Sequence, residues 1–300
     1  MRRRLRNISI IAALVVAVLI IAALVTIVSA PRQFATDFTR GSLERAGFEK
    51  QVFEHDRGHI TYFEGGQGPT VVFVHGLADQ SGSWFRIAPK LEGHRIILVD
   101  LPRHGESPFK TDEEALSTEV FAPLFDLLQK RIGEERATFI ANSMGGWIAM
   151  EYALSHPEQV EQLILANSAG LSHEVDTTLL TPSNREEARR TVRTIFGDNT
   201  PPLPGFVLDR IVERAGESLA STVVTQMEEV EFLDDRLPEV TPRVHLVWGD
   251  QDLIFPMDYA RRLDGLLPTS QLHVIDGCGH SPQVGCPGEF LEIIDAVLGR

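Results

Sequence analysis

The chain alternates short runs of apolar, β-branched residues with longer segments in which apolar residues recur every three or four positions. Runs of the first kind are typical of strands buried on both faces of a sheet, and segments of the second kind predict amphipathic helices. From residue 51 onward the two kinds alternate, which predicts an α/β fold with a mostly parallel sheet flanked by helices. The predicted buried strands lie at residues 70–74, 95–99, 137–141, 162–166, 244–248 and 271–275.

The predicted helices carry recognisable boundary residues. The helix at 145–155 stops before His156-Pro157, because the residue that precedes a proline avoids the helical conformation. The helices at 256–267 and 287–298 each begin with a proline, which is favoured in the first turn. These boundaries indicate helices that connect neighbouring parallel strands.

The regular alternation stops between about residues 171 and 241. This segment is charged and helical in pattern and is interrupted by the proline-rich residues 200–205. Because it separates two predicted core strands, we expect a helical cap over the carboxyl edge of the sheet. The predicted organisation is an anchor at 1–30, a linker at 31–50 and an α/β domain at 51–300 that contains the cap.

The first 30 residues have a different pattern. Arginines at positions 2, 3, 4 and 6 precede residues 8–28, which contain no charge, proline or glycine. As a helix, this run would be about 31 Å long, close to the thickness of the hydrocarbon core of a bilayer. We therefore predict an N-terminal transmembrane helix with the arginines in the cytoplasm and the following domain outside it, in the periplasm of a Gram-negative cell.

Two alternatives compete with this single-pass membrane location. Residues 28–30, Val-Ser-Ala, resemble a signal-peptide cleavage site, and cleavage there would make the protein secreted. A buried core helix is the weaker alternative, because such a helix rarely lacks a polar face over so many turns.

The charge balance is acidic, with 42 Asp and Glu residues against 28 Lys and Arg residues. Four of the basic residues belong to the N-terminal segment, so the rest of the chain is more acidic than the formal charge of −14 suggests. Such a domain has no electrostatic basis for binding nucleic acid.

The two cysteines, Cys278 and Cys286, are too few for a disulfide scaffold and lack the spacing of a metal site. They could pair with each other in an exported domain. We expect instead that they are two small, buried, hydrophobic side chains.

The strongest candidate for chemistry is the segment from Ile140 to Gly146, Ile-Ala-Asn-Ser-Met-Gly-Gly, which joins a predicted strand to a predicted helix. A serine in such a sharp turn is held in a strained conformation that exposes its Oγ, and small residues two positions away on either side permit close packing. Ala141 replaces the first glycine of the Gly-x-Ser-x-Gly pattern. Ser143 is therefore a candidate nucleophile, although serine is also a common helix cap.

Two further candidates follow later strands in the same way. Asp252 comes after the strand at 244–248, and His280 lies in the glycine-rich loop after the strand at 271–275. Because the carboxyl ends of parallel strands meet at one edge of the sheet, these side chains should converge with Ser143. They would then serve as orienting acid, general base and nucleophile. Asn167, after another strand, could not replace the acid because an amide carries no charge.

The segment Val74-His-Gly-Leu77 follows the strand at 70–74. A turn at this position can aim the Leu77 N–H at the point that the Met144 N–H faces, and two such donors stabilise an oxyanion. His75 is expected to shape this loop rather than to transfer protons.

On these residues the chain resembles the α/β-hydrolase superfamily over essentially all of 51–300. Residues 101–107, Leu-Pro-Arg-His-Gly-Glu-Ser, are also similar to a loop of that family. The resemblance implies no metal and no organic cofactor. It implies a triad and an oxyanion hole formed by Ser143, Asp252, His280, Leu77 and Met144.

The resemblance further implies a serine hydrolase similar to esterases and lipases of the monoacylglycerol lipase type. The expected substrate is a lipophilic or acylglycerol-like carboxylic ester, and Phe206, Met227 and Phe232 of the cap are either acyl contacts or a small core. Haloalkane dehalogenases and epoxide hydrolases of this fold have an aspartate in place of Ser143, which argues against both activities.

The alternative is a carbon–carbon bond hydrolase of the meta-cleavage-product type, whose elbow is similar to Asn142-Ser-Met-Gly-Gly146. Those enzymes usually have a tryptophan after the catalytic histidine, where this chain has Ser281. A third interpretation, a non-catalytic binding domain on the same fold, is disfavoured by the complete set of triad residues.

Overall fold

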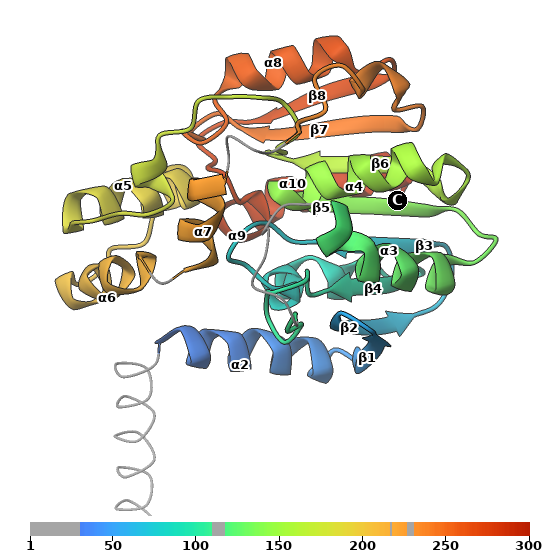
Figure 1. Ribbon diagram of the computed structural model, residues 1–300, viewed down its shortest axis with the longest axis horizontal. Coiled ribbons are helices and arrows are strands. Elements are labelled where there is room, and N and C mark those ends of the chain that lie inside the picture. Colours follow the sequence, from blue (N-terminus) through green and yellow to red (C-terminus); the bar gives the residue numbers. More distant parts are fainter. Residues whose placement is uncertain (1–30, 110–117, 217, 227–230) are drawn as a thin grey trace, which may run out of the picture.

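A single eight-stranded sheet forms the centre of the computed structural model, which describes residues 31–109, 118–216, 218–226 and 231–300. The strand order is β1-β2-β4-β3-β5-β6-β7-β8 (Figure 1). From β4 to β8 neighbouring strands run parallel, whereas β2 is antiparallel to both β1 and β4. The predicted α/β architecture is therefore confirmed, with a mixed sheet. The strands are β1 Glu49–His55, β2 Gly58–Gly66, β3 Thr70–Val74, β4 Arg95–Val99, β5 Ala137–Asn142, β6 Val160–Ala166, β7 Arg243–Gly249 and β8 Ser270–Ile275.

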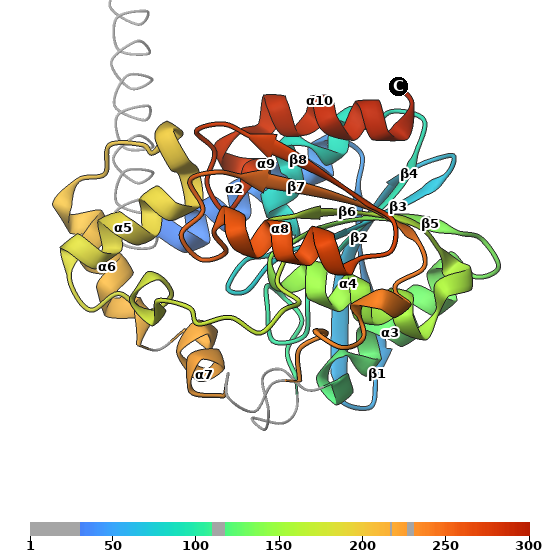
Figure 2. The same cartoon turned by 90° about the horizontal axis from the view of Figure 1, so that it is seen from above.

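Helices cover both faces of the sheet, as Figure 2 shows. The helices α3, α4 and α8 lie on one face, and α10 lies on the other with the short 3-10 helix η1. The helices are α2 Pro31–Arg45, α3 Thr118–Ile132, α4 Met144–Ser155, α5 Arg185–Phe196, α6 Gly205–Ala215, α7 Leu219–Gln226, α8 Met257–Leu266, α9 Pro282–Gly285 and α10 Pro287–Leu298, and η1 spans Ser81–Arg86.

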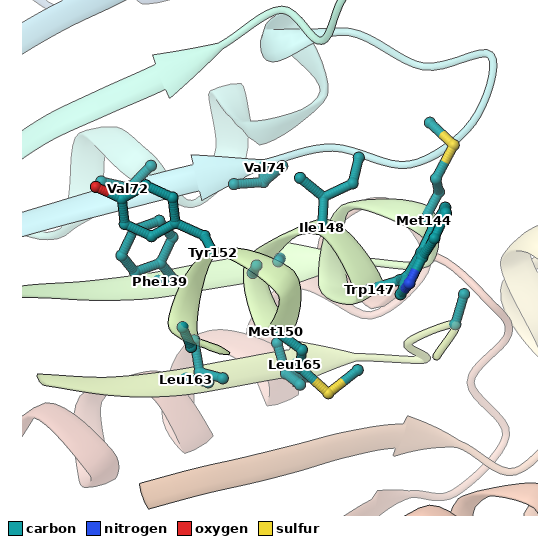
Figure 3. Packing of buried hydrophobic residues seen from close by; sticks show 14 of the residues in the cluster. Val72, Val74, Phe139, Met144, Trp147, Ile148, Met150, Tyr152, Leu163 and Leu165 are labelled. Atoms are coloured by element: carbon teal, nitrogen blue, oxygen red, sulfur yellow. The ribbon is translucent and has the colours of Figure 1, made fainter. Parts of the chain in front are cut away.

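The apolar run of β3 shows why these strands lack an alternating pattern. Val72 and Val74 pack in the core between the sheet and α4, whereas Val71 and Phe73 pack in the core on the η1 and α10 side. All five residues of the strand are buried, because successive side chains point to opposite, covered faces. Figure 3 shows the α4 side, where Ile148 lies among side chains of the neighbouring strands.

The helices α5, α6 and α7 belong to the segment between β6 and β7 and project beyond the carboxyl ends of the strands (Figures 1 and 2). The helix α5 begins after an N-cap residue, Asn184, whose side chain accepts hydrogen bonds from the N–H groups of Glu186 and Glu187.

The prediction of a transmembrane helix requires a correction. In the part of the chain that the structure describes, no helix combines the length and the apolar composition needed to cross a bilayer. The transmembrane element of the fold prediction, and the single-pass membrane location that depended on it, are therefore not borne out. The segment at 1–30 on which both rested lies outside the described residues.

The cysteine prediction is also wrong. Cys278 and Cys286 are buried as expected, but they form a disulfide rather than two free thiols, with their Cα atoms 6.0 Å apart. Spacing alone did not distinguish these outcomes, because the pairing depends on how the chain turns between β8 and α10.

Candidate active site

Ser143 lies in the turn between β5 and α4 with φ 55° and ψ −126°. A positive φ costs a residue with a side chain of order 1–3 kcal/mol, so the surrounding structure must hold it in place. Three backbone hydrogen bonds do so. The Ser143 N–H donates to the Ala166 carbonyl at 3.1 Å, and the Ser143 carbonyl accepts from Gly146 at 2.9 Å and from Ala169 at 3.0 Å.

The small residues around Ser143 are required by close contacts with the neighbouring loops. A Cβ atom on Gly145 would lie 2.4 Å from the His75 carbonyl oxygen, and one on Gly146 would lie 2.1 Å from the Ser168 hydroxyl oxygen. Ala141, which replaces the first glycine of the pattern, is fully buried. The helix α4 can therefore begin directly against the loops that follow β3 and β6.

His280 and Asp252 meet although they come from loops after different strands. The His280 Nδ1 lies 2.7 Å from Asp252 Oδ2, and both residues are buried. The other carboxylate oxygen, Oδ1, accepts hydrogen bonds from the N–H groups of Ile254 at 2.8 Å and Phe255 at 3.2 Å. A carboxylate held in this way keeps the proton of the imidazole on Nδ1 and leaves Nε2 as an acceptor.

Ser143 and His280 line the same cavity. Within the described residues, however, no hydrogen bond joins the Ser143 hydroxyl to the His280 ring. The structure thus joins the predicted acid to the predicted base directly and brings the predicted nucleophile to the same cavity without a direct bond.

Asn142 supplies a link between the two loops that the sequence did not reveal. Its buried side-chain amide donates to the main-chain carbonyl of His280 at 2.9 Å and to that of Ala166 at 2.9 Å. Its Oδ1 accepts a hydrogen bond from the buried Gln283 at 3.1 Å. The residue next to Ser143 therefore fixes the loop that carries His280.

Asn167, which cannot serve as the acid, instead contacts the acid directly. Its Nδ2 donates to Asp252 Oδ2 at 2.8 Å, and its Oδ1 accepts from the Gly249 N–H at 3.1 Å. Its φ of 44° is another strained value, tolerated best by asparagine among residues with side chains. Asn167 is thus a neutral partner that orients the carboxylate.

The His280 loop is also fastened to the end of α5. The N–H groups of His280 and Ser281 donate to the carbonyls of Thr194 at 2.7 Å and Ile195 at 3.1 Å. The last carbonyls of a helix have no partner within the helix, so this loop satisfies two of them. The disulfide described above joins residues on either side of the same loop.

Leu77 and Met144 both line the cavity beside Ser143. In the described part of the chain, neither main-chain N–H donates to another protein group, which leaves both available to a ligand.

Both ring nitrogens of His75 have hydrogen-bond partners: its Nδ1 lies 2.7 Å from the Gly76 carbonyl, and its Nε2 accepts from the Leu101 N–H at 3.0 Å. Burial lowers the pKa of His75 to about 4. The expectation that His75 shapes the loop is confirmed.

The cavity has a volume of about 360 Å³ and is lined mainly by apolar side chains from the sheet edge, from the segment between β6 and α5, and from α5 and α7. Of the three cap residues named from the sequence, Phe232 lines it, Met227 lies outside the described residues, and Phe206 is half exposed on α6 and does not contribute. The expectation for Phe206 was therefore wrong, because the helix turns that side chain toward solvent. Among the described residues no group of three or more His, Cys, Asp or Glu side chains is arranged to hold a metal ion.

Comparison with known proteins shows which chains this one is similar to. A family model described as the alpha/beta hydrolase fold matches residues 69–214. An uncharacterized protein of Mycobacterium tuberculosis is 27% identical over 263 residues, which cover 78% of this chain and 76% of that protein. The 2-hydroxy-6-oxo-6-phenylhexa-2,4-dienoate hydrolase of Comamonas testosteroni is 29% identical over 252 residues, 77% of this chain and 88% of that enzyme.

Among solved structures, a membrane phospholipase A described as a bacterial virulence factor superposes with a TM-score of 0.76 and 25% identity, covering 100% of this chain and 98% of its own. Three observations indicate the same fold family: the order of the strands, the strained serine between β5 and α4, and the matched family model. These findings support assignment of the chain to the α/β-hydrolase superfamily as a hydrolase.

Proposed function

We propose that the protein hydrolyses carboxylic esters of lipophilic acyl groups through an acyl-enzyme on Ser143. His280 accepts the Ser143 proton as Oγ attacks the acyl carbonyl, and it then protonates the leaving alcohol. Asp252 keeps the imidazole in the Nδ1–H tautomer and stabilises the imidazolium. The Leu77 and Met144 N–H groups stabilise the oxyanion. Water then attacks the acyl-enzyme, with His280 as general base, and releases the acid.

The lack of a hydrogen bond between the Ser143 hydroxyl and the His280 ring in the described structure is compatible with this mechanism. A serine hydroxyl reaches different positions by rotation about a single bond, and catalytic hydrogen bonds are often loose until substrate binds. The three hydrogen bonds to the Ser143 backbone hold the rest of the residue still while the hydroxyl turns.

The apolar character of the cavity wall is the observation that favours a lipophilic ester as the substrate. Ser143 and His280 lie among residues such as Trp147, Val223 and Phe232, and no Arg or Lys is among the described residues that line it. Burial of an acyl chain there is favourable by about 25 cal/mol per Å² of apolar surface. A neutral lipophilic ester fits such a wall, and the 25% identity to a membrane phospholipase A along the whole chain supports the same class.

The second candidate is carbon–carbon bond hydrolysis of a dienoate. The 29% identity to the Comamonas enzyme and the elbow Asn142-Ser-Met-Gly-Gly146 favour it. A dienoate carries a carboxylate, however, and burying that charge without a cationic partner is costly. The absence of Arg and Lys from the described cavity wall, and Ser281 where such enzymes usually have tryptophan, favour the ester.

The proposal can be tested on the full chain with p-nitrophenyl esters of increasing acyl length and with 2-hydroxy-6-oxo-6-phenylhexa-2,4-dienoate. We expect kcat/KM to rise with chain length until the acyl group fills the cavity, and we expect little turnover of the dienoate. Ser143→Ala should abolish ester hydrolysis. Faster turnover of the dienoate than of every ester would favour the second candidate, and no turnover of either would favour a binding domain.

A further inference from the structure

The loop that carries Leu77 is fastened at both ends to the loop that follows β4. At its start, the buried ring of His75 accepts the hydrogen bond of the Leu101 N–H at 3.0 Å. At its end, the Ser81 N–H donates to Asp100 Oδ1 at 2.8 Å. Between these two attachments Ala78 has φ 58°, a value that an alanine adopts only where its surroundings impose it.

Asp100 is the centre of the second attachment. It is fully buried, and besides Ser81 its carboxylate accepts the Glu106 N–H at 2.9 Å on Oδ2. A buried carboxylate requires a positive partner. Arg40 of α2 supplies it through an ion pair between Nη2 and Asp100 Oδ2.

Arg40 does more than neutralise Asp100. Its Nε donates to the side-chain oxygen of Gln80 at 2.6 Å, and its Nη1 lies 2.5 Å from Glu106 Oε1. Arg40 is only 6% exposed, which is unusual for an arginine and indicates a structural use of its side chain. One side chain of α2 thus holds Gln80, at the end of the Leu77 loop, against Asp100.

We infer that Arg40 is a positioning residue that holds the Leu77 N–H where the oxyanion develops. The inference rests on the proposed function, in which Leu77 is an oxyanion donor. Arg40 is not among the described residues that line the cavity. It acts through Gln80 and Asp100, which set the end of a short strained loop whose start is fixed by His75. Because such a donor works only at hydrogen-bond distance from the oxyanion, a small shift of this loop weakens it.

The test compares Arg40→Lys and Gln80→Met with the control Arg45→Lys. Arg45 is exposed on α2, and its side chain donates a hydrogen bond to Ser42. Arg40→Lys keeps the positive charge near Asp100 but loses the fork that reaches Gln80. Gln80→Met leaves the Arg40–Asp100 pair intact, so it remains informative if Arg40→Lys is unstable. The readouts are kcat and KM for an ester and the Ki of an acyl trifluoromethyl ketone, which adds to the serine and places an oxyanion in the hole.

We expect both test variants to lower kcat about tenfold and to raise the Ki of the ketone by a similar factor, with KM within about twofold of the wild type. Arg45→Lys should change none of these values. If the wild type binds the ketone and both test variants bind it equally well, the inference is overturned while the proposed function stands. If the wild type itself neither hydrolyses esters nor binds the ketone, the proposed function is overturned and this inference with it.

Discussion

The side-chain amide of Asn142 donates a hydrogen bond to the main-chain carbonyl of His280 at 2.9 Å, across 138 residues of sequence. Asn142 immediately precedes Ser143 in the chain. A rigid connection therefore exists between the backbone that carries the proposed nucleophile and the backbone that carries the proposed base. The distance between these two groups is set by this connection as well as by the sheet.

We predict that Asn142→Ala lowers kcat by about tenfold to a hundredfold with a smaller effect on KM. The substitution removes two donated bonds and leaves the buried Gln283 amide without its acceptor, at a cost of about 1–3 kcal/mol. Steady-state kinetics with an ester substrate measure the effect. Gln51→Ala, an exposed position on β1, is the matched control, and equal kcat values for the two variants would contradict the prediction.

Glycine at position 145 is required by contact with the main chain rather than by a special conformation. A Cβ there would lie 2.4 Å and 2.5 Å from the carbonyl oxygens of His75 and Val74. Gly145→Ala should therefore lower the free energy of unfolding by about 1–3 kcal/mol and reduce activity, since α4 must shift. Gly265→Ala on α8 meets no atom within 4 Å and should be neutral or stabilise by up to about 1 kcal/mol. Urea unfolding of the two variants measures the contrast, and similar midpoints would argue against the close packing described here.

The disulfide between Cys278 and Cys286 closes a short loop around His280. Closing a loop of this size reduces the entropy of the unfolded chain by an amount worth about 2–3 kcal/mol. Reductant should therefore lower the denaturant midpoint of the wild type but leave that of a Cys278→Ala/Cys286→Ala variant unchanged. Titration of the unfolded, unreduced wild type should find no free thiol. Two free thiols in that titration would mean that the pair is not formed.

His75 predicts a pH dependence of stability. Burial lowers its pKa to about 4 in the folded protein, against about 6.5 in the unfolded chain. The unfolded state therefore binds more protons between these values, so the contribution of His75 is complete above about pH 6.5 and is lost as pH falls toward 4. The loss amounts to about 3 kcal/mol.

Unfolding curves from pH 7 to pH 4 for the wild type and for His75→Asn, which lacks a titrating group, measure this contribution. The decline in the free energy of unfolding should be shallower in His75→Asn. Parallel declines in the two proteins would show that other groups account for the acid sensitivity.

The sequence predicted the parts of this fold that follow from local pattern. The buried strands are continuous apolar runs because both faces of the sheet are covered, and the turn at Ser143 has a local signature of small residues around a serine. The candidate residues Asp252 and His280 could be placed at the sheet edge because each follows a parallel strand.

The supporting hydrogen bonds could not be predicted, because they join loops that are distant in sequence and have no local signature. Asn167 contacts Asp252 across 85 residues, and Gln283 contacts Asn142 across 141. The exposure of Phe206 depends on how α6 is turned, and composition gives no information on that rotation. The sequence does place an asparagine directly after a predicted buried strand, and that position at the sheet edge could have drawn attention to Asn167.

If Ser143 is a nucleophile activated by His280, a reagent that traps activated serines should form a covalent adduct on it. The full chain is treated with a fluorophosphonate and digested, and the modified peptide is identified by mass spectrometry. We predict a single adduct on Ser143, none in Ser143→Ala, and labelling slowed by at least about a hundredfold in His280→Ala. An unlabelled wild type, an adduct on another residue, or labelling of His280→Ala at the wild-type rate would contradict the account.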